Sequence, residues 1–78
     1  MTTTERVRKI LIDKLDISEE QVVPNATITG DLKADSLDKM DIMMGLQEEF
    51  DINIPDNDVD QINTVQQIVD YIDTRLNA

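Results

Sequence analysis

The stretch DSLDKMDIMMGLQEEF, residues 35–50, contains the most informative helix of the chain. Asp35 is a favoured N-cap residue, so the helix is predicted to begin at Ser36 and to end near Phe50. At about 100° per residue, its apolar side chains fall on two roughly opposite faces. The larger apolar group predicts the face that packs into a core, and it consists of Ile42, Met43, Leu46 and Phe50.

The smaller apolar group of this helix has two interpretations. Either the loop before the helix folds over it, or it stays exposed and docks other proteins, and the sequence favours neither. In the second case nearby carboxylates would steer a basic partner toward it. Two methionines would suit a surface that meets several partners. The group is Leu37, Met40 and Met44, flanked by Asp41 and Glu48, with Asp38 close by.

Two further long helices are predicted, one before this helix in the sequence and one after it. The first is capped by Thr2 or Thr4, of which Thr2 has capping-box spacing to Glu5, and it ends near Asp16. The last begins at a second such pair, Thr64 and Gln67. Its spacing of apolar residues predicts a buried stripe. That stripe consists of Val65, Ile68, Val69, Ile72 and Leu76.

A long connection, roughly residues 17–35, joins the first two helices, with Pro24 and Gly30 as turn signals. A brief helical turn is predicted over residues 56–61, after Pro55. No segment alternates with the period of a strand, so the expected fold class is all-α: three main helices plus a short third one, around an aliphatic core. The apolar residues expected to anchor the long loop are Val22, Val23, Ile28 and Leu32.

The composition narrows the functional classes. The 78-residue chain has a net charge of −10 and contains neither cysteine nor histidine. Ten acidic and two basic residues lie between residues 30 and 60, which argues against nucleic-acid and anionic-membrane binding and for basic protein partners. No membrane span or signal peptide is recognisable. We therefore expect a cytoplasmic monomer with a single domain, residues 1–78, and no metal site.

Ser36 is the candidate site residue. The other serine, Ser18, has capping-box spacing to Gln21, whereas Asp35 is the better cap beside Ser36 and frees its hydroxyl. A helix N-terminus favours a bound phosphate by about 0.3–1 kcal/mol. The chain has no histidine to serve as the base that a serine nucleophile needs, and a surface lysine such as Lys39 is a poor substitute for one. Ser36 is therefore predicted to be modified by another enzyme, and the chain is expected to be a substrate or a carrier rather than a catalyst.

Two other functional classes are alternatives. A calcium-binding loop needs glycine at its sixth position and glutamate at its twelfth. Counted from Asp56 these positions hold Gln61 and Gln67, so the pattern fails. Counted from Asp51 they hold Asp56 and Ile62, and it fails again, which leaves only weak divalent binding to the acidic surface. A pure interaction module, such as an acidic mimic of nucleic acid, predicts that neither serine is modified.

Five blocks of the sequence, taken in order, resemble the motifs of a known protein family. The central block is Asp31-Leu32-Lys33-Ala34-Asp35-Ser36-Leu37-Asp38, and the others lie at residues 48–52, 54–56, 64–66 and 70–72. In order and spacing they resemble the acyl carrier proteins, most closely those of fatty acid synthesis. The resemblance covers nearly the whole chain. It implies a small four-helix bundle with a long loop between helices 1 and 2.

The resemblance also implies a function. A phosphopantetheinyl transferase would attach 4′-phosphopantetheine from coenzyme A to Ser36, and the thiol of that arm would carry acyl groups as thioesters between enzymes of fatty acid biosynthesis. A specialised carrier for polyketide, D-alanyl or other acyl transfer is the alternative. The implied docking surface for enzymes with basic patches consists of Asp35, Leu37, Asp38, Met40, Asp41, Met44 and Glu48. The implied acyl pocket consists of Ile28, Leu46, Ile54, Val59, Ile62 and Ile68.

The chain departs from the family pattern at five positions. Lys33 stands where glycine is usual, which adds a charge and removes a flexible joint beside the arm. Gly45 stands where alanine is common, and this glycine is expected to lower the stability of the helix by about 1 kcal/mol. Gln47 replaces a frequent acid, which is expected to dilute the charge of the docking surface slightly. Val59 and Ile68 are bulkier than the alanine of many members, and we expect them to reshape the pocket.

Overall fold

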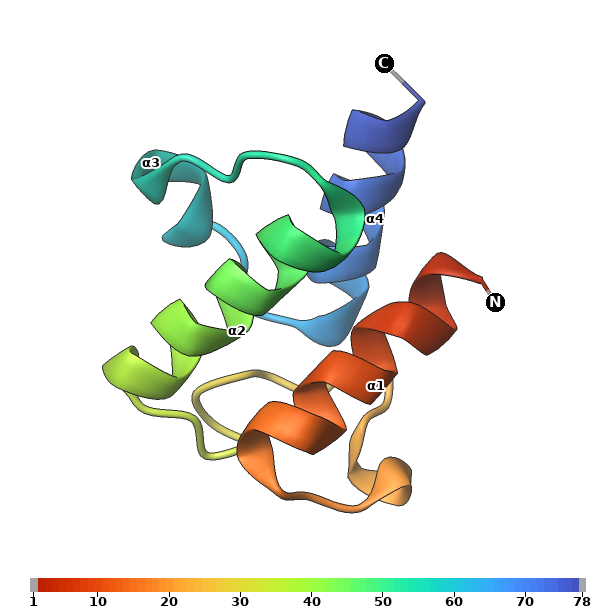
Figure 1. Ribbon diagram of the computed structural model, residues 1–78. Coiled ribbons are helices and arrows are strands. Elements are labelled where there is room, and N and C mark those ends of the chain that lie inside the picture. Colours follow the sequence, from red (N-terminus) through yellow and green to blue (C-terminus); the bar gives the residue numbers. More distant parts are fainter. Residues whose placement is uncertain (1, 78) are drawn as a thin grey trace.

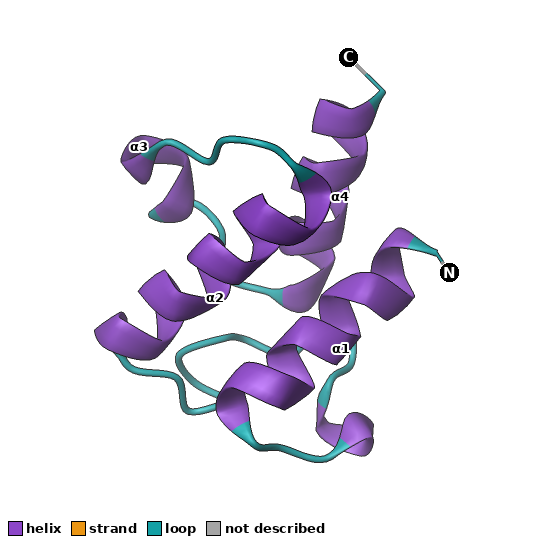
Figure 2. Cartoon of the chain, in the orientation of Figure 1, coloured by secondary structure: helices purple, strands orange, loops and turns teal. Residues whose placement is uncertain are grey.

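The computed structural model describes residues 2–77, which form four α-helices and one short 3-10 helix. The elements are α1 (Thr3–Leu15), η1 (Glu19–Gln21), α2 (Ser36–Phe50), α3 (Asp56–Val59) and α4 (Val65–Leu76). Helix α1 packs against both α2 and α4, and the long loop between α1 and α2 closes one end of the bundle (Figure 1). Figure 2 shows helices and loops but no strand in this part of the chain. The predicted all-α fold is confirmed.

Side-chain caps fix the starts of the outer helices. Thr2 Oγ1 accepts a hydrogen bond from Glu5 N at 3.1 Å, and the Glu5 side chain returns to the Thr2 backbone. Thr64 and Gln67 form the same reciprocal pair at α4. Both predicted capping boxes are therefore confirmed. Such a cap contributes about 0.5–2 kcal/mol relative to alanine, which matters in a domain of this size.

One cluster of apolar side chains forms the core, and α1, α2 and α4 all contribute to it. The predicted inner face of α2 is at most 5% exposed. The other buried helix residues of the core are Val7 and Leu11 of α1 and four residues of α4. Leu76, predicted to continue the α4 stripe, is instead 47% exposed, because it ends a helix that extends past the bundle (Figure 1). The buried α2 residues are Ile42, Met43, Leu46 and Phe50, and those of α4 are Val65, Ile68, Val69 and Ile72.

The long loop packs onto the start of α4. Ile28 N donates a hydrogen bond to Asn63 O at 2.8 Å, so the loop is joined to the segment that leads into α4. Of the predicted anchors, Val22, Ile28 and Leu32 are buried. Val23 is 48% exposed, because its neighbour Val22 takes the inward position in the turn that follows η1. The loop is therefore part of the packed structure and holds the start of α2 in place.

Lys33, just before α2, adopts the left-handed conformation with φ 58°. Its side chain is exposed and so gains no packing in return. An L-residue in this region loses about 1–2 kcal/mol relative to ordinary backbone. Lys33, which stands where the family usually has glycine, thus keeps the backbone conformation that glycine adopts easily. With a lysine in this position, that conformation is strained.

Replacing Lys33 with glycine is expected to raise the free energy of unfolding by about 0.5–1 kcal/mol, since relief of strain outweighs the added entropy of an unfolded glycine. Urea denaturation followed by circular dichroism measures the change. Lys33→Ala is the matched control, because it removes the same charge and keeps the β-carbon. If it stabilises the protein as much as Lys33→Gly does, charge and not backbone strain explains the effect.

Candidate functional site

Ser36 is the first residue of α2, and its side chain is exposed. Asp35 Oδ1 accepts from Asp38 N at 2.8 Å, and Asp38 Oδ2 accepts from Asp35 N at 3.3 Å, so these two residues form the cap of the helix. Within residues 2–77 the Ser36 hydroxyl has no hydrogen-bond partner. Ser18 differs, because its Oγ donates to Gln21 Oε1 at 3.2 Å. Ser36 therefore presents an unused hydroxyl at a helix N-terminus, where a phosphate ester is favoured.

The outer face of α2 carries an exposed apolar strip. Leu37 is 75% exposed, Met40 60% and Met44 56%. The long loop packs elsewhere, so of the two interpretations of this strip, exposure is correct. Such an apolar strip on the surface of a small domain indicates a contact site.

Four carboxylates edge this strip. Asp35, Asp41 and Glu48 are exposed, and Asp38 is half-buried as part of the cap. We keep the name docking surface for these acids with the three apolar residues, the set implied by the resemblance. An apolar strip bordered by negative charge is complementary to a basic protein surface.

Gln47, one of the departures from the family pattern, is half-buried and ties a loop to α2. Its Nε2 donates to Met43 O at 3.2 Å, and its Oε1 accepts from Ile54 N at 3.0 Å. This side chain holds the segment between α2 and α3, a role that sequence reasoning missed. No sequence signal marks it, because the hydrogen bond to Ile54 exists only once the chain has turned back after α2.

The six predicted acyl-pocket residues gather in the core from six separate segments. Five of the six are at most 5% exposed, and Val59 is partly buried and packs against them. Ile62 also lines an open cavity of about 330 Å³ between α3 and α4. Within the packed core an acyl chain needs these side chains to move apart, so the pocket stays a prediction. The five are Ile28, Leu46, Ile54, Ile62 and Ile68.

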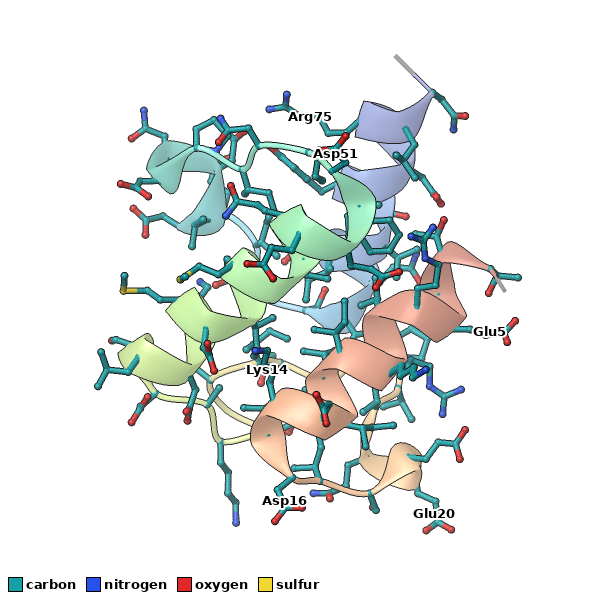
Figure 3. The ribbon with its side chains drawn as sticks, in the orientation of Figure 1. Glu5, Lys14, Asp16, Glu20, Asp51 and Arg75 are labelled. Atoms are coloured by element: carbon teal, nitrogen blue, oxygen red, sulfur yellow. The ribbon has the colours of Figure 1, made fainter. Side chains whose placement is uncertain are left out.

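Helix α3 ends at Val59, earlier than predicted, and is held to α4 by polar bonds. Tyr71 Oη donates to Asp58 Oδ2 at 2.7 Å. Arg75, labelled in Figure 3, donates to Tyr71 Oη at 2.7 Å and pairs with Asp58 at 3.3 Å. Burial first, and then the hydrogen bond to Asp58, raise the pKa of Tyr71 above its ordinary value of 10.0. The phenol therefore remains a donor at neutral pH.

A second open cavity, about 720 Å³, lies along α1 near the end of α2. Among its lining residues are Arg6 and Glu49, which pair at 2.8 Å, and the Arg6 guanidinium lies 4.2 Å from the Phe50 ring centroid. Ser36 is at the opposite end of α2. This cavity is therefore remote from the candidate attachment site, and its Arg6 is engaged in joining α1 to α2.

No group of three or more acidic, imidazole or thiol side chains in the described part of the chain is placed to hold a metal ion. Asp58, in the segment compared above with a calcium loop, instead bonds Tyr71. Over residues 2–77, no helix has the length and apolar character needed to cross a membrane.

Comparison with protein families bears directly on the exposed serine. The family model described as phosphopantetheine attachment site matches residues 5–72, most of the chain. The matched stretch includes Ser36 and all of α2. Domains of this family carry a covalently attached 4′-phosphopantetheine group and are carriers rather than catalysts. The chain therefore belongs to the phosphopantetheine attachment site family, as a carrier domain of the acyl carrier protein type.

Proposed function

We propose that the protein carries acyl groups as thioesters on a 4′-phosphopantetheine arm attached to Ser36, and moves them between enzymes of fatty acid biosynthesis. The observation that carries the proposal is the exposed Ser36 hydroxyl, left free by the Asp35–Asp38 cap at the start of α2. The only other serine bonds Gln21. The arm supplies a thiol, which a chain without cysteine otherwise lacks.

Loading of Ser36 requires a second enzyme, a phosphopantetheinyl transferase. Its base takes the proton of Ser36 Oγ as the bond from Oγ to phosphorus forms and the phosphoanhydride bond of coenzyme A breaks, releasing adenosine 3′,5′-bisphosphate. The first backbone N–H groups of α2 lack partners within the helix and favour the phosphodiester. Asp35 and Asp38 oppose it by charge. The chain thus contributes a positioned hydroxyl, and the transferase contributes the base.

The identity of the pathway is tested by the group that the arm carries. The protein is purified from its native source, and the thioester is identified by mass spectrometry. Straight-chain acyl groups, saturated or with the oxygen and double-bond pattern of chain elongation, support fatty acid synthesis. A polyketide or aminoacyl group would contradict that assignment and favour a specialised carrier.

The docking surface is expected to bind the transferase through its negative charge. Asp41→Lys reverses one of these charges and is expected to raise the KM of loading about tenfold, equivalent to about 1.4 kcal/mol, while changing the melting temperature little. Initial rates of mass gain with coenzyme A and a broad-specificity transferase give the KM.

Glu20→Lys is the matched control for this charge reversal. It changes the net charge by the same amount at an exposed position of η1, far from α2 in Figure 3. If both variants raise the KM equally, overall charge and not the docking surface governs binding. If Asp41→Lys unfolds the protein, Asp41 does not lie on the exposed face of α2.

A further inference from the structure

One carboxylate of the docking surface already has a cation beside it. Lys14 Nζ lies 3.7 Å from Asp41 Oδ1. Lys14 is in the last turn of α1, and Figure 3 shows its side chain between α1 and α2. The other three acids of the docking surface form no ion pair with any residue in the range 2–77. Asp41 is therefore distinguished from its neighbours by an internal counter-ion.

The space that Lys14 occupies is left by a glycine. A β-carbon at Gly45 would lie 3.2 Å from Lys14 Cε, tighter than an ordinary contact. Asp41 and Gly45 are four residues apart, so they are neighbours on one face of α2. The Lys14 stem passes over the bare turn at Gly45 and brings its ammonium group to Asp41. The packing of α1 on α2 thus directs this cation toward the docking surface.

The pair is open to exchange. The side chain of Lys14 is 35% exposed and that of Asp41 is 59% exposed, so water and an approaching basic side chain reach the carboxylate. An incoming lysine or arginine that pairs with Asp41 must share the carboxylate with Lys14 or displace it. The gain from the new pair is then offset by loss of the old one.

We propose that Lys14 masks Asp41 and thereby weakens the docking of basic partner enzymes. This inference rests on the proposed function, because it assigns a specificity-setting role to a residue outside the docking surface. It predicts that removal of the Lys14 charge tightens the binding of a phosphopantetheinyl transferase. It also predicts that this effect requires the carboxylate of Asp41.

The test compares Lys14→Gln with Lys9→Gln in the loading assay with coenzyme A and transferase. Lys9 is an exposed cation of the same helix with no ion pair in the described part of the chain, and both changes alter the net charge equally. The KM of Lys14→Gln is expected to be about 1.5- to 5-fold lower than that of Lys9→Gln, the range for an exposed ion pair. In an Asp41→Asn background, Lys14→Gln is expected to have no effect beyond that of Lys9→Gln.

Salt provides a second readout. At about 1 M NaCl the screening length falls to about 3 Å, so the difference between the two variants is expected to disappear. Equal KM values at low salt, or a Lys14→Gln effect that persists in the Asp41→Asn background, would overturn the masking role and leave the proposed function intact. Absence of any mass gain on the wild-type protein would overturn the proposed function and this inference with it.

Discussion

Ser36→Ala is expected to gain no mass with coenzyme A and a transferase, whereas the wild-type protein gains one phosphopantetheine arm. The change removes a hydroxyl that is exposed and has no hydrogen-bond partner within the described residues. Alanine is a better helix former than serine, and Asp35 keeps its capping bond to Asp38. The free energy of unfolding is therefore expected to stay within about 0.5 kcal/mol of wild type.

Intact mass spectrometry after a fixed incubation measures loading, and circular dichroism on the same sample measures folding. Ser18→Ala is the matched control, since it removes the only other serine hydroxyl and should load as wild type does. It loses the bond to Gln21, worth about 0.5–1.5 kcal/mol at most. Mass gain on Ser36→Ala would exclude Ser36 as the attachment residue. Loss of its helical signal would show a structural role that its geometry does not explain.

Leu46→Ala is expected to lose about 2–5 kcal/mol of stability, the range for truncating a buried leucine. Leu46 is 0% exposed and lies in the single core cluster, so the surrounding side chains can close only part of the cavity. Domains are stable by about 5–15 kcal/mol, and a chain of this length belongs at the low end. The variant should therefore be partly unfolded near physiological temperature, which thermal and urea unfolding measure directly.

Met44→Ala, two positions away on the same helix, is the control. Met44 is 56% exposed on the opposite face, so its truncation is expected to change stability by no more than about 0.5 kcal/mol. The contrast tests which face of α2 enters the core. Similar losses from both variants would mean that both faces are buried in solution and that the docking surface is not available to partners.

Local rules account for what sequence reasoning predicted well. The starts of all three long helices follow from capping pairs within three or four residues, and the cap at Asp35 explains why the neighbouring Ser36 stays free. The inner face of α2 follows from helical periodicity. Predictions were weaker where the chain leaves a helix: Val23 and Leu76 are exposed, and α3 is short. At such positions periodicity no longer applies, and packing decides.

The sequence by itself determined the starts of the three long helices and the inner face of α2, and it predicts Ser36 as the residue to be modified, because each depends on residues close together in the chain. The tertiary structure alone decided that the outer face of α2 is uncovered, since this depends on the path of a long loop. It also decided the contacts of Gln47 with Ile54 and of Lys14 with Asp41. Long flexible side chains reach partners set by how the helices pack, and no local pattern specifies them. For Ser36 the sequence and the tertiary structure agree, because the start of α2 is set by nearby residues and the Asp35–Asp38 cap leaves the Ser36 hydroxyl exposed.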